Sequence, residues 1–247
     1  MMLALRSLSF NIAFFLWSTL VQVLFMPSLL FPAVVVAWVQ RLWIGGSLAL
    51  LAGICDLRHE IRGLEHLPPG PCIIASKHQS TWDTLIFAVL FHGIAFIVKR
   101  ELLWIPLFGW YIQRTGCIPI DRQGGASALK RMIAGARNAI GDGQYIIIFP
   151  EGTRVAPGQR RPYHPGVGAL YRQLGVPVVP VVLDSGRFWG RRTFIKRPGR
   201  ITLEFLEPIA PGLSRKDFTA ELERRIETAS VRLLAPAQGA TRTEPGA

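Results

Sequence analysis

Residues 71–91 read PCIIASKHQSTWDTLIFAVLF, and this stretch indicates the fold of the chain. Its first part, 71–76, is a short apolar run followed by polar residues, which is typical of a buried strand. The apolar stretch at about 81–91 has the length of a helix. His78 and Asp83 therefore fall in the turn between a strand and a helix, where a carboxylate can hold an imidazole that acts as a base.

A purely structural explanation of this turn also fits. Ser80-Thr81-Trp82-Asp83 matches the S-x-x-[DE] capping box that opens many helices. A single His–Asp pair at this spacing also arises easily by chance. The two explanations are compatible, because a cap at Ser80 would fix the start of the helix and place Asp83 on its first turn, facing back toward His78.

Beyond residue 58 the chain alternates between short apolar runs and helical stretches. We expect further strands and helices, with no internal repeat, at 94–98 (strand), 102–113 (helical in part), 117–120 (strand), 127–140 (helix), 145–149 (strand), 165–174 (helix), 176–183 (strand), 201–205 (strand) and 214–234 (helix). This alternation predicts an α/β fold with an open, mostly parallel sheet flanked by helices.

The N-terminal part of the chain has a different composition. Residues 7–40 carry no charge, and that run exceeds the ~20 residues that one bilayer span requires. Two helices, 5–26 and 33–55, joined by a proline turn, would form a hairpin that spans the membrane or dips into one leaflet. The alternative is a hairpin buried in the core of a soluble protein. We predict three parts: a membrane-associated helical hairpin at 1–57, a catalytic domain at 58–235 and a disordered tail at 236–247.

The charge of the chain indicates which classes of partner it binds and on which side of a membrane it lies. The formal net charge is +12 and the mean hydropathy is +0.31, a combination that favours an anionic lipid surface or an acidic substrate. Arg6, Arg41 and Arg58 favour the cytoplasmic side, so we expect the catalytic domain to face the cytoplasm at the cell inner membrane or another membrane. The chain has no zinc-ligand spacing, basic helix or ribonucleoprotein motif, so nucleic acid is not an expected partner.

Polar residues follow several of the predicted strands at their carboxyl ends. Besides His78, these are Lys99, Arg122 and the segment Phe149-Pro150-Glu151-Gly152-Thr153-Arg154. Ligands of open α/β sheets bind at this edge, so we expect these side chains to converge. The alternative for any one of them is a charge on a solvated loop.

These segments resemble, in order, the four sequence blocks of the 1-acyl-sn-glycerol-3-phosphate acyltransferases, within the glycerolipid acyltransferase superfamily. The similar blocks are His78 to Asp83 (an H-x4-D motif), Lys99 to Arg122, Phe149 to Arg154, and Val176 to Val181. The resemblance covers residues of about 60–210, and the apolar hairpin also fits the family. One departure is His164, which stands near a position where members often carry lysine.

The resemblance implies acyl transfer from a thioester, acyl-CoA or acyl-carrier protein, to the sn-2 hydroxyl of 1-acyl-glycerol-3-phosphate (lysophosphatidic acid), giving phosphatidic acid. His78 would be the general base and Asp83 its partner. The expected residues for the substrate phosphate or the oxyanion are Lys99, Arg122, Glu151, Gly152, Thr153 and Arg154. Glu151 would orient Arg154. No metal and no cofactor other than the acyl donor is expected.

Other functions stay open at this level. The acceptor could be another lyso-lipid, such as lyso-ornithine lipid. A hydrolase would need a nucleophile, and no G-x-S-x-G motif occurs. A non-catalytic lipid-binding protein is the third class. Residues 185–200 carry six basic residues among aromatic ones, which predicts a surface facing lipid headgroups or, alternatively, a solvated basic hairpin.

Overall fold

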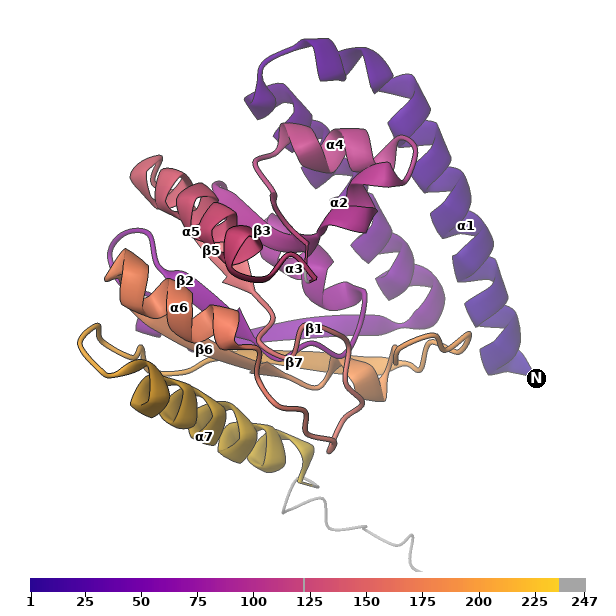
Figure 1. Ribbon diagram of the computed structural model, residues 1–247. Coiled ribbons are helices and arrows are strands. Elements are labelled where there is room, and N and C mark those ends of the chain that lie inside the picture. The colour runs from indigo at the N-terminus through magenta and orange to yellow at the C-terminus, as the bar shows by residue number, and fades with distance from the viewer. Residues whose placement is uncertain (122, 236–247) are drawn as a thin grey trace, which may run out of the picture.

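A seven-stranded sheet runs through the middle of the molecule in the order β1-β7-β6-β2-β5-β3-β4 (Figure 1). The computed structural model describes residues 1–121 and 123–235. The strands are β1 (Leu57–Arg62), β2 (Ile73–Ser76), β3 (Ile94–Lys99), β4 (Ile118–Ile120), β5 (Tyr145–Ile148), β6 (Val178–Leu183) and β7 (Gly199–Phe205). Only β7 against β6 is antiparallel, and every other pair is parallel. The predicted open, mostly parallel sheet is confirmed.

Helices cover both faces of this sheet. They are α1 (Met2–Leu24), α2 (Ala33–Cys55), α3 (Trp82–Leu90), α4 (Phe108–Arg114), α5 (Gly125–Gly141), α6 (Pro165–Leu174) and α7 (Arg215–Leu234). In Figure 1, α1 (indigo) stands at the opposite side of the molecule from α6 and α7 (orange to yellow). Single 3₁₀ turns add η1 (Met26–Leu30), η2 (Leu64–His66), η3 (Arg100–Trp104) and η4 (Ser185–Arg187).

The alternation of side chains along β2 divides the core in two. Ile73 and Ala75 lie in the apolar cluster beneath α5, α6 and α7. Cys72 and Ile74 lie in the other cluster, beneath α1, α2 and α3. Successive strand residues point to opposite faces, and both faces of β2 are buried. This explains why the strand reads as a continuous apolar run.

The helices α1 and α2 form the predicted N-terminal hairpin, closed by η1. Each has 23 residues and is long and apolar enough to cross a membrane, and only 17% and 28% of their most apolar stretches are buried. Large apolar side chains therefore face outward along α1, among them Ile12, Phe15 and Leu20. A hairpin buried in a soluble core does not fit this exposure.

The charged residue of α2, Arg41, contacts the C-terminal end of α3. Arg41 contacts His92 and donates from Nη2 to the carbonyl oxygen of Val89, 3.0 Å away, in the last turn of α3. Carbonyls at a helix C-terminus carry partial negative charge. The arginine that interrupts the apolar run thus fixes α2 against the end of α3.

One sequence prediction needs correction. Strand β1 was not expected, because its sequence LRHEIR has no apolar alternation and its burial is partial at the sheet edge. The segment 185–200, expected to face lipid headgroups or solvent, keeps five of its six basic side chains exposed, whereas Trp189 packs edge-on against Phe10 of α1. Lys196 is 4% exposed, and its Nζ donates to Asn11 Oδ1 at 2.7 Å. The tail at 236–247 lies outside the described residues.

The α1–α2 contact has no room for a side chain at Gly46. A Cβ there would lie 2.4 Å from the Trp17 indole, whereas Gly45, one position earlier, has nothing within 4 Å. Gly46→Ala should lower the free energy of unfolding by about 1–3 kcal/mol, because the indole must move. Gly45→Ala is the matched control and should stabilise the helix by up to ~1 kcal/mol. Thermal unfolding in detergent measures both, and equal effects would contradict this packing.

Candidate active site

His78 and Asp83 form a hydrogen-bonded pair at the carboxyl end of β2. The Nδ1 of His78 lies 2.9 Å from Oδ2 of Asp83, on the first turn of α3. The His78 ring stacks on Phe149, with 4.0 Å between ring centroids. With Nδ1–H donating to the carboxylate, the lone pair is on Nε2. The side chain of His78 is 12% exposed and lines a large cavity.

The buried carboxylate of Asp83 collects four donors. Its Oδ2 accepts from His78 and from the backbone N–H groups of Gln79 (2.7 Å) and Ser80 (2.8 Å). Its Oδ1 accepts from Ser185 Oγ at 2.5 Å, from the segment that follows β6. Asp83 faces back toward His78, as the capping pattern predicted. Ser80 Oγ, however, accepts from the Trp82 N–H.

The segment after β5 holds the backbone of His78 from both sides. The His78 N–H donates to Glu151 Oε2 at 3.2 Å, and the His78 carbonyl accepts from the Val155 N–H at 2.8 Å. Gly152 makes the intervening turn possible with φ of 64°, and its N–H donates to the Phe149 carbonyl. The Gly152 N–H is therefore already used and does not point to an oxyanion.

Glu151 belongs to a buried charge cluster, and the expected contact with Arg154 is absent among the described ion pairs. Its side chain is 1% exposed, and Oε1 lies 2.8 Å from Lys77 Nζ. Lys77 also lies 2.6 Å from Glu227 of α7, to which Tyr163 donates at 3.2 Å. Burial raises the pKa of Glu151, and Lys77 partly offsets this. No local sequence pattern indicates that Lys77 and Glu227 pair, because they are 150 positions apart.

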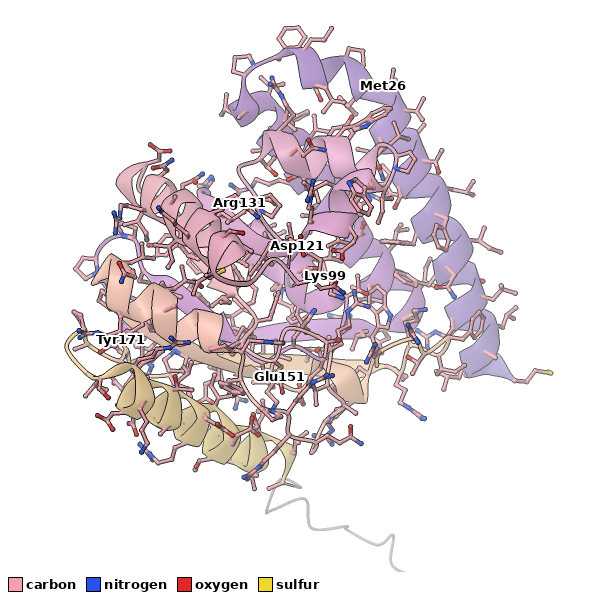
Figure 2. The ribbon with its side chains drawn as sticks, viewed as in Figure 1. Met26, Lys99, Asp121, Arg131, Glu151 and Tyr171 are labelled. Atoms are coloured by element: carbon pink, nitrogen blue, oxygen red, sulfur yellow. The ribbon has the colours of Figure 1, made fainter. Side chains whose placement is uncertain are left out.

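The other expected residues lie around the cavity, which has a volume of about 1410 Å³. Lys99, Gly152, Thr153 and Arg154 line it together with His78. Figure 2 labels Lys99, at the end of β3, and Glu151, just after β5. Burial lowers the pKa of the Arg154 guanidinium, while the nearby Asp83 carboxylate favours its charged form. Arg122 lies outside the described residues.

Most of the cavity wall away from His78 is apolar. Side chains from several elements contribute, including Leu85, Phe96, Leu102, Phe108, Ile112 and Leu129. The wall reaches Val34 and Ala37 on α2, the hairpin helix. A largely apolar space that meets a polar site fits an alkyl chain whose reactive end meets His78. The sequence did not predict this space, since its wall comes from separate parts of the chain.

Comparison with known proteins agrees with this geometry. A sequence model of the family described as Acyltransferase matches residues 58–184. A protein of Pseudomonas aeruginosa named 1-acyl-sn-glycerol-3-phosphate acyltransferase is 37% identical over 187 residues, covering 76% of this chain and 72% of the relative. The chain belongs to the acyltransferase family.

Further relatives of this acyltransferase carry similar names. The 1-acyl-sn-glycerol-3-phosphate acyltransferase alpha of Mus musculus is 35% identical, with 66% of this chain and 59% of the relative covered. The chain therefore spans less than two thirds of that mammalian relative. The crystal structure of the 1-acyl-sn-glycerophosphate (LPA) acyltransferase PlsC from Thermotoga maritima shares the fold, with a TM-score of 0.75 and 23% identity. That match covers 94% of this chain and 99% of the other.

The cysteine on the cavity wall of this acyltransferase is a poor nucleophile. Burial raises the pKa of the Cys117 thiol to about 11. A thiol attacks only as its thiolate, so Cys117 keeps its proton and its reactivity low at neutral pH. Ser185, the serine nearest to the His–Asp pair, is fully buried and donates to Asp83.

The buried cluster gives a pH-dependent prediction. Lys77→Met leaves Glu151 without a cation and Glu227 with only Arg160, 3.6 Å away, so the free energy of unfolding at pH 7 should fall by about 3–5 kcal/mol. Because burial raises the pKa of Glu151, the folded variant binds more protons than the unfolded chain. The deficit should therefore shrink as the pH falls toward the ordinary range of a glutamate.

Denaturant unfolding in detergent, at several pH values, measures this deficit against the parent protein. Lys130→Met, which removes an exposed lysine from α5, is the control and should have little effect. A deficit that stays constant with pH would contradict the buried carboxylate as its cause.

Proposed function

We propose that the protein transfers an acyl group from an acyl thioester to the sn-2 hydroxyl of 1-acyl-glycerol-3-phosphate, giving phosphatidic acid. The observation that carries this proposal is the placement of His78. Its ring is held by Asp83, and it lies where an apolar cavity meets Arg154 and Lys99. The names of the relatives support the same acceptor.

The reaction needs one proton carrier and no protein nucleophile. His78 Nε2 takes the proton from the acceptor hydroxyl while its oxygen attacks the thioester carbonyl carbon. The tetrahedral intermediate collapses, the carbon–sulfur bond breaks, and the imidazolium returns the proton to the leaving thiolate. Asp83 keeps the tautomer and stabilises the imidazolium in between. The products are an ester and the free thiol of the donor.

Cations on the cavity wall would hold the charges of this reaction. Arg154 fits the acceptor phosphate by charge-assisted hydrogen bonds, with Thr153 as a further candidate on the wall. Arg122, outside the described residues, stays a candidate from the sequence. Lys99 fits the oxyanion of the tetrahedral intermediate. The acyl donor, acyl-CoA or acyl-carrier protein, acts as co-substrate, and the proposed chemistry uses no metal or other cofactor.

The hairpin would give the active site access to membrane lipid. We propose that α1 and α2 insert into the cell inner membrane or another membrane, with the catalytic domain on the cytoplasmic side. The exposed apolar side chains of α1 and the length of both helices support membrane insertion. The cavity wall on α2 then gives a lyso-lipid a path from the bilayer to His78.

One observation favours a second class of acceptor. His164 lines the cavity where family members often carry lysine. An acceptor without a phosphomonoester, such as lyso-ornithine lipid, needs fewer cations there. Lyso-ornithine lipid is therefore one of the acceptors in the transfer assay.

The direct test is acyl transfer by the purified protein, with a panel of lyso-lipids and both thioester donors. Lysophosphatidic acid should be the preferred acceptor. His78→Ala should lower kcat by roughly 10²–10⁴, because the general base is lost, while thermal unfolding shows an intact fold. His66→Ala changes a histidine outside the cavity and should leave kcat near the parent value. A folded His78→Ala variant with parental kcat would overturn the mechanism.

A further inference from the structure

Three of the described arginines that line the cavity, Arg154, Arg191 and Arg192, belong to two neighbouring segments. Arg154 follows the Glu151-Gly152-Thr153 turn and is half-buried, whereas Arg191 and Arg192, between β6 and β7, are exposed. The two segments touch, since Arg191 Nη1 lies 3.4 Å from the Arg154 carbonyl oxygen. These cations come from separate segments and meet at one opening.

No carboxylate pairs with any of these three arginines among the ion pairs of the described residues. Burial lowers the pKa of Arg154, the nearby Asp83 carboxylate opposes this, and the like charge of Arg191 lowers it further. Cations that no carboxylate contacts at ion-pair distance are stabilised by a bound anion.

We propose that Arg191 and Arg192 bind the phosphate groups of the acyl donor, apart from the acceptor phosphate at Arg154. This rests on the proposed function. In the acceptor, the phosphate sits on the carbon next to the one that bears the reacting hydroxyl, so its cation must lie close to His78. In a pantetheine thioester, the phosphate lies at the far end of a long arm. Its cations must therefore lie further out, and Arg191 and Arg192 are the exposed members of the three.

Steady-state kinetics with acyl-CoA and lysophosphatidic acid separate the two sites. The double variant Arg191→Gln/Arg192→Gln should raise the KM for the donor about tenfold or more, the effect of a lost charge-assisted hydrogen bond. The KM for the acceptor should stay near the parent value. Arg154→Gln should show the reverse. The matched control, Arg197→Gln/Arg200→Gln, removes the same charge from exposed residues that do not line the cavity.

Pyrophosphate gives a readout that does not depend on turnover. Calorimetry should detect its binding to the parent protein and to the control, and a clear loss in the Arg191→Gln/Arg192→Gln variant. Equal pyrophosphate binding, an unchanged KM for the donor, or a rise confined to the acceptor would overturn the donor site. A parent protein that binds pyrophosphate but transfers no acyl group would instead contradict the proposed function.

A different observation, the contact of Ser185 with Asp83, carries a second inference. Ser185 is fully buried, and its Oγ lies 2.5 Å from Asp83 Oδ1. Its carbonyl accepts from the N–H groups of Phe188 (3.1 Å) and Trp189 (2.8 Å), and the next residue, Gly186, donates to Gln79 Oε1 at 3.0 Å. The hydroxyl is thus fixed on the carboxylate and is kept away from the cavity.

The geometry points to Ser185 as a positioning residue that limits how strongly Asp83 holds a proton on His78. Three donors already orient the carboxylate through Oδ2. The fourth, from Ser185, mainly withdraws negative charge from it. A carboxylate that shares its charge with a hydroxyl stabilises an imidazolium less, so the contact with Ser185 weakens the hold of Asp83 on a proton at His78.

Ser185→Ala should move the midpoint of the acidic limb of the kcat/KM–pH profile upward by about half a unit or more. Activity lost near neutral pH should return at higher pH. Ser185→Cys, a weaker donor, should give an intermediate midpoint. Other charged groups around the pair are unchanged in these variants: Lys77, Lys99, Glu151, Arg154, Arg191 and Arg192.

Ser230→Ala is the matched control, because the Ser230 hydroxyl is buried and has no hydrogen-bond partner among the described residues. Its midpoint should equal that of the parent. An unchanged midpoint in Ser185→Ala, with or without a loss of rate, would overturn the tuning role and leave Ser185 as packing.

Discussion

The arrangement of the site depends on the buried carboxylate of Asp83. It receives hydrogen bonds from the His78 ring, from two backbone amides of the loop and from Ser185 after β6. An ionised carboxylate in an apolar environment is costly unless such donors surround it. The need to satisfy this one group therefore fixes the loop after β2, the start of α3 and the segment after β6 against one another.

A second buried group extends this constraint to the rest of the catalytic part. Lys77, next to His78, pairs with Glu151 after β5 and with Glu227 on α7. Glu151 in turn accepts from the His78 backbone. Buried charges persist only when paired, so the cluster ties the His78 loop to the Glu151 turn and to a helix far along the chain. Asp83 thus holds the ring of His78, and Glu151 holds its backbone. Together these two contacts fix the position of the His78 Nε2 atom.

Much of the fold was predictable from the sequence because its signals are local. The apolar run at 71–76 and the helix start at Trp82 depend on neighbouring residues, and the strand-end positions of Lys99 and Arg154 follow from sheet geometry. The edge strand β1 was not predictable, since its residues are polar and its pairing with β7 is long-range. Ser185 and Lys77 also escaped prediction, because their partners lie 102 and 150 positions away.

In the proposed mechanism His78 acts directly on the acceptor hydroxyl, and no acyl group passes through the protein. The buried hydroxyl of Ser185 and the protonated thiol of Cys117 are consistent with this mechanism. Intact-mass measurement after incubation of the purified protein with excess acyl thioester and no acceptor is the decisive test. We expect an unmodified mass, followed by product formation once lysophosphatidic acid is added. A stoichiometric acyl adduct that disappears on addition of the acceptor would contradict it.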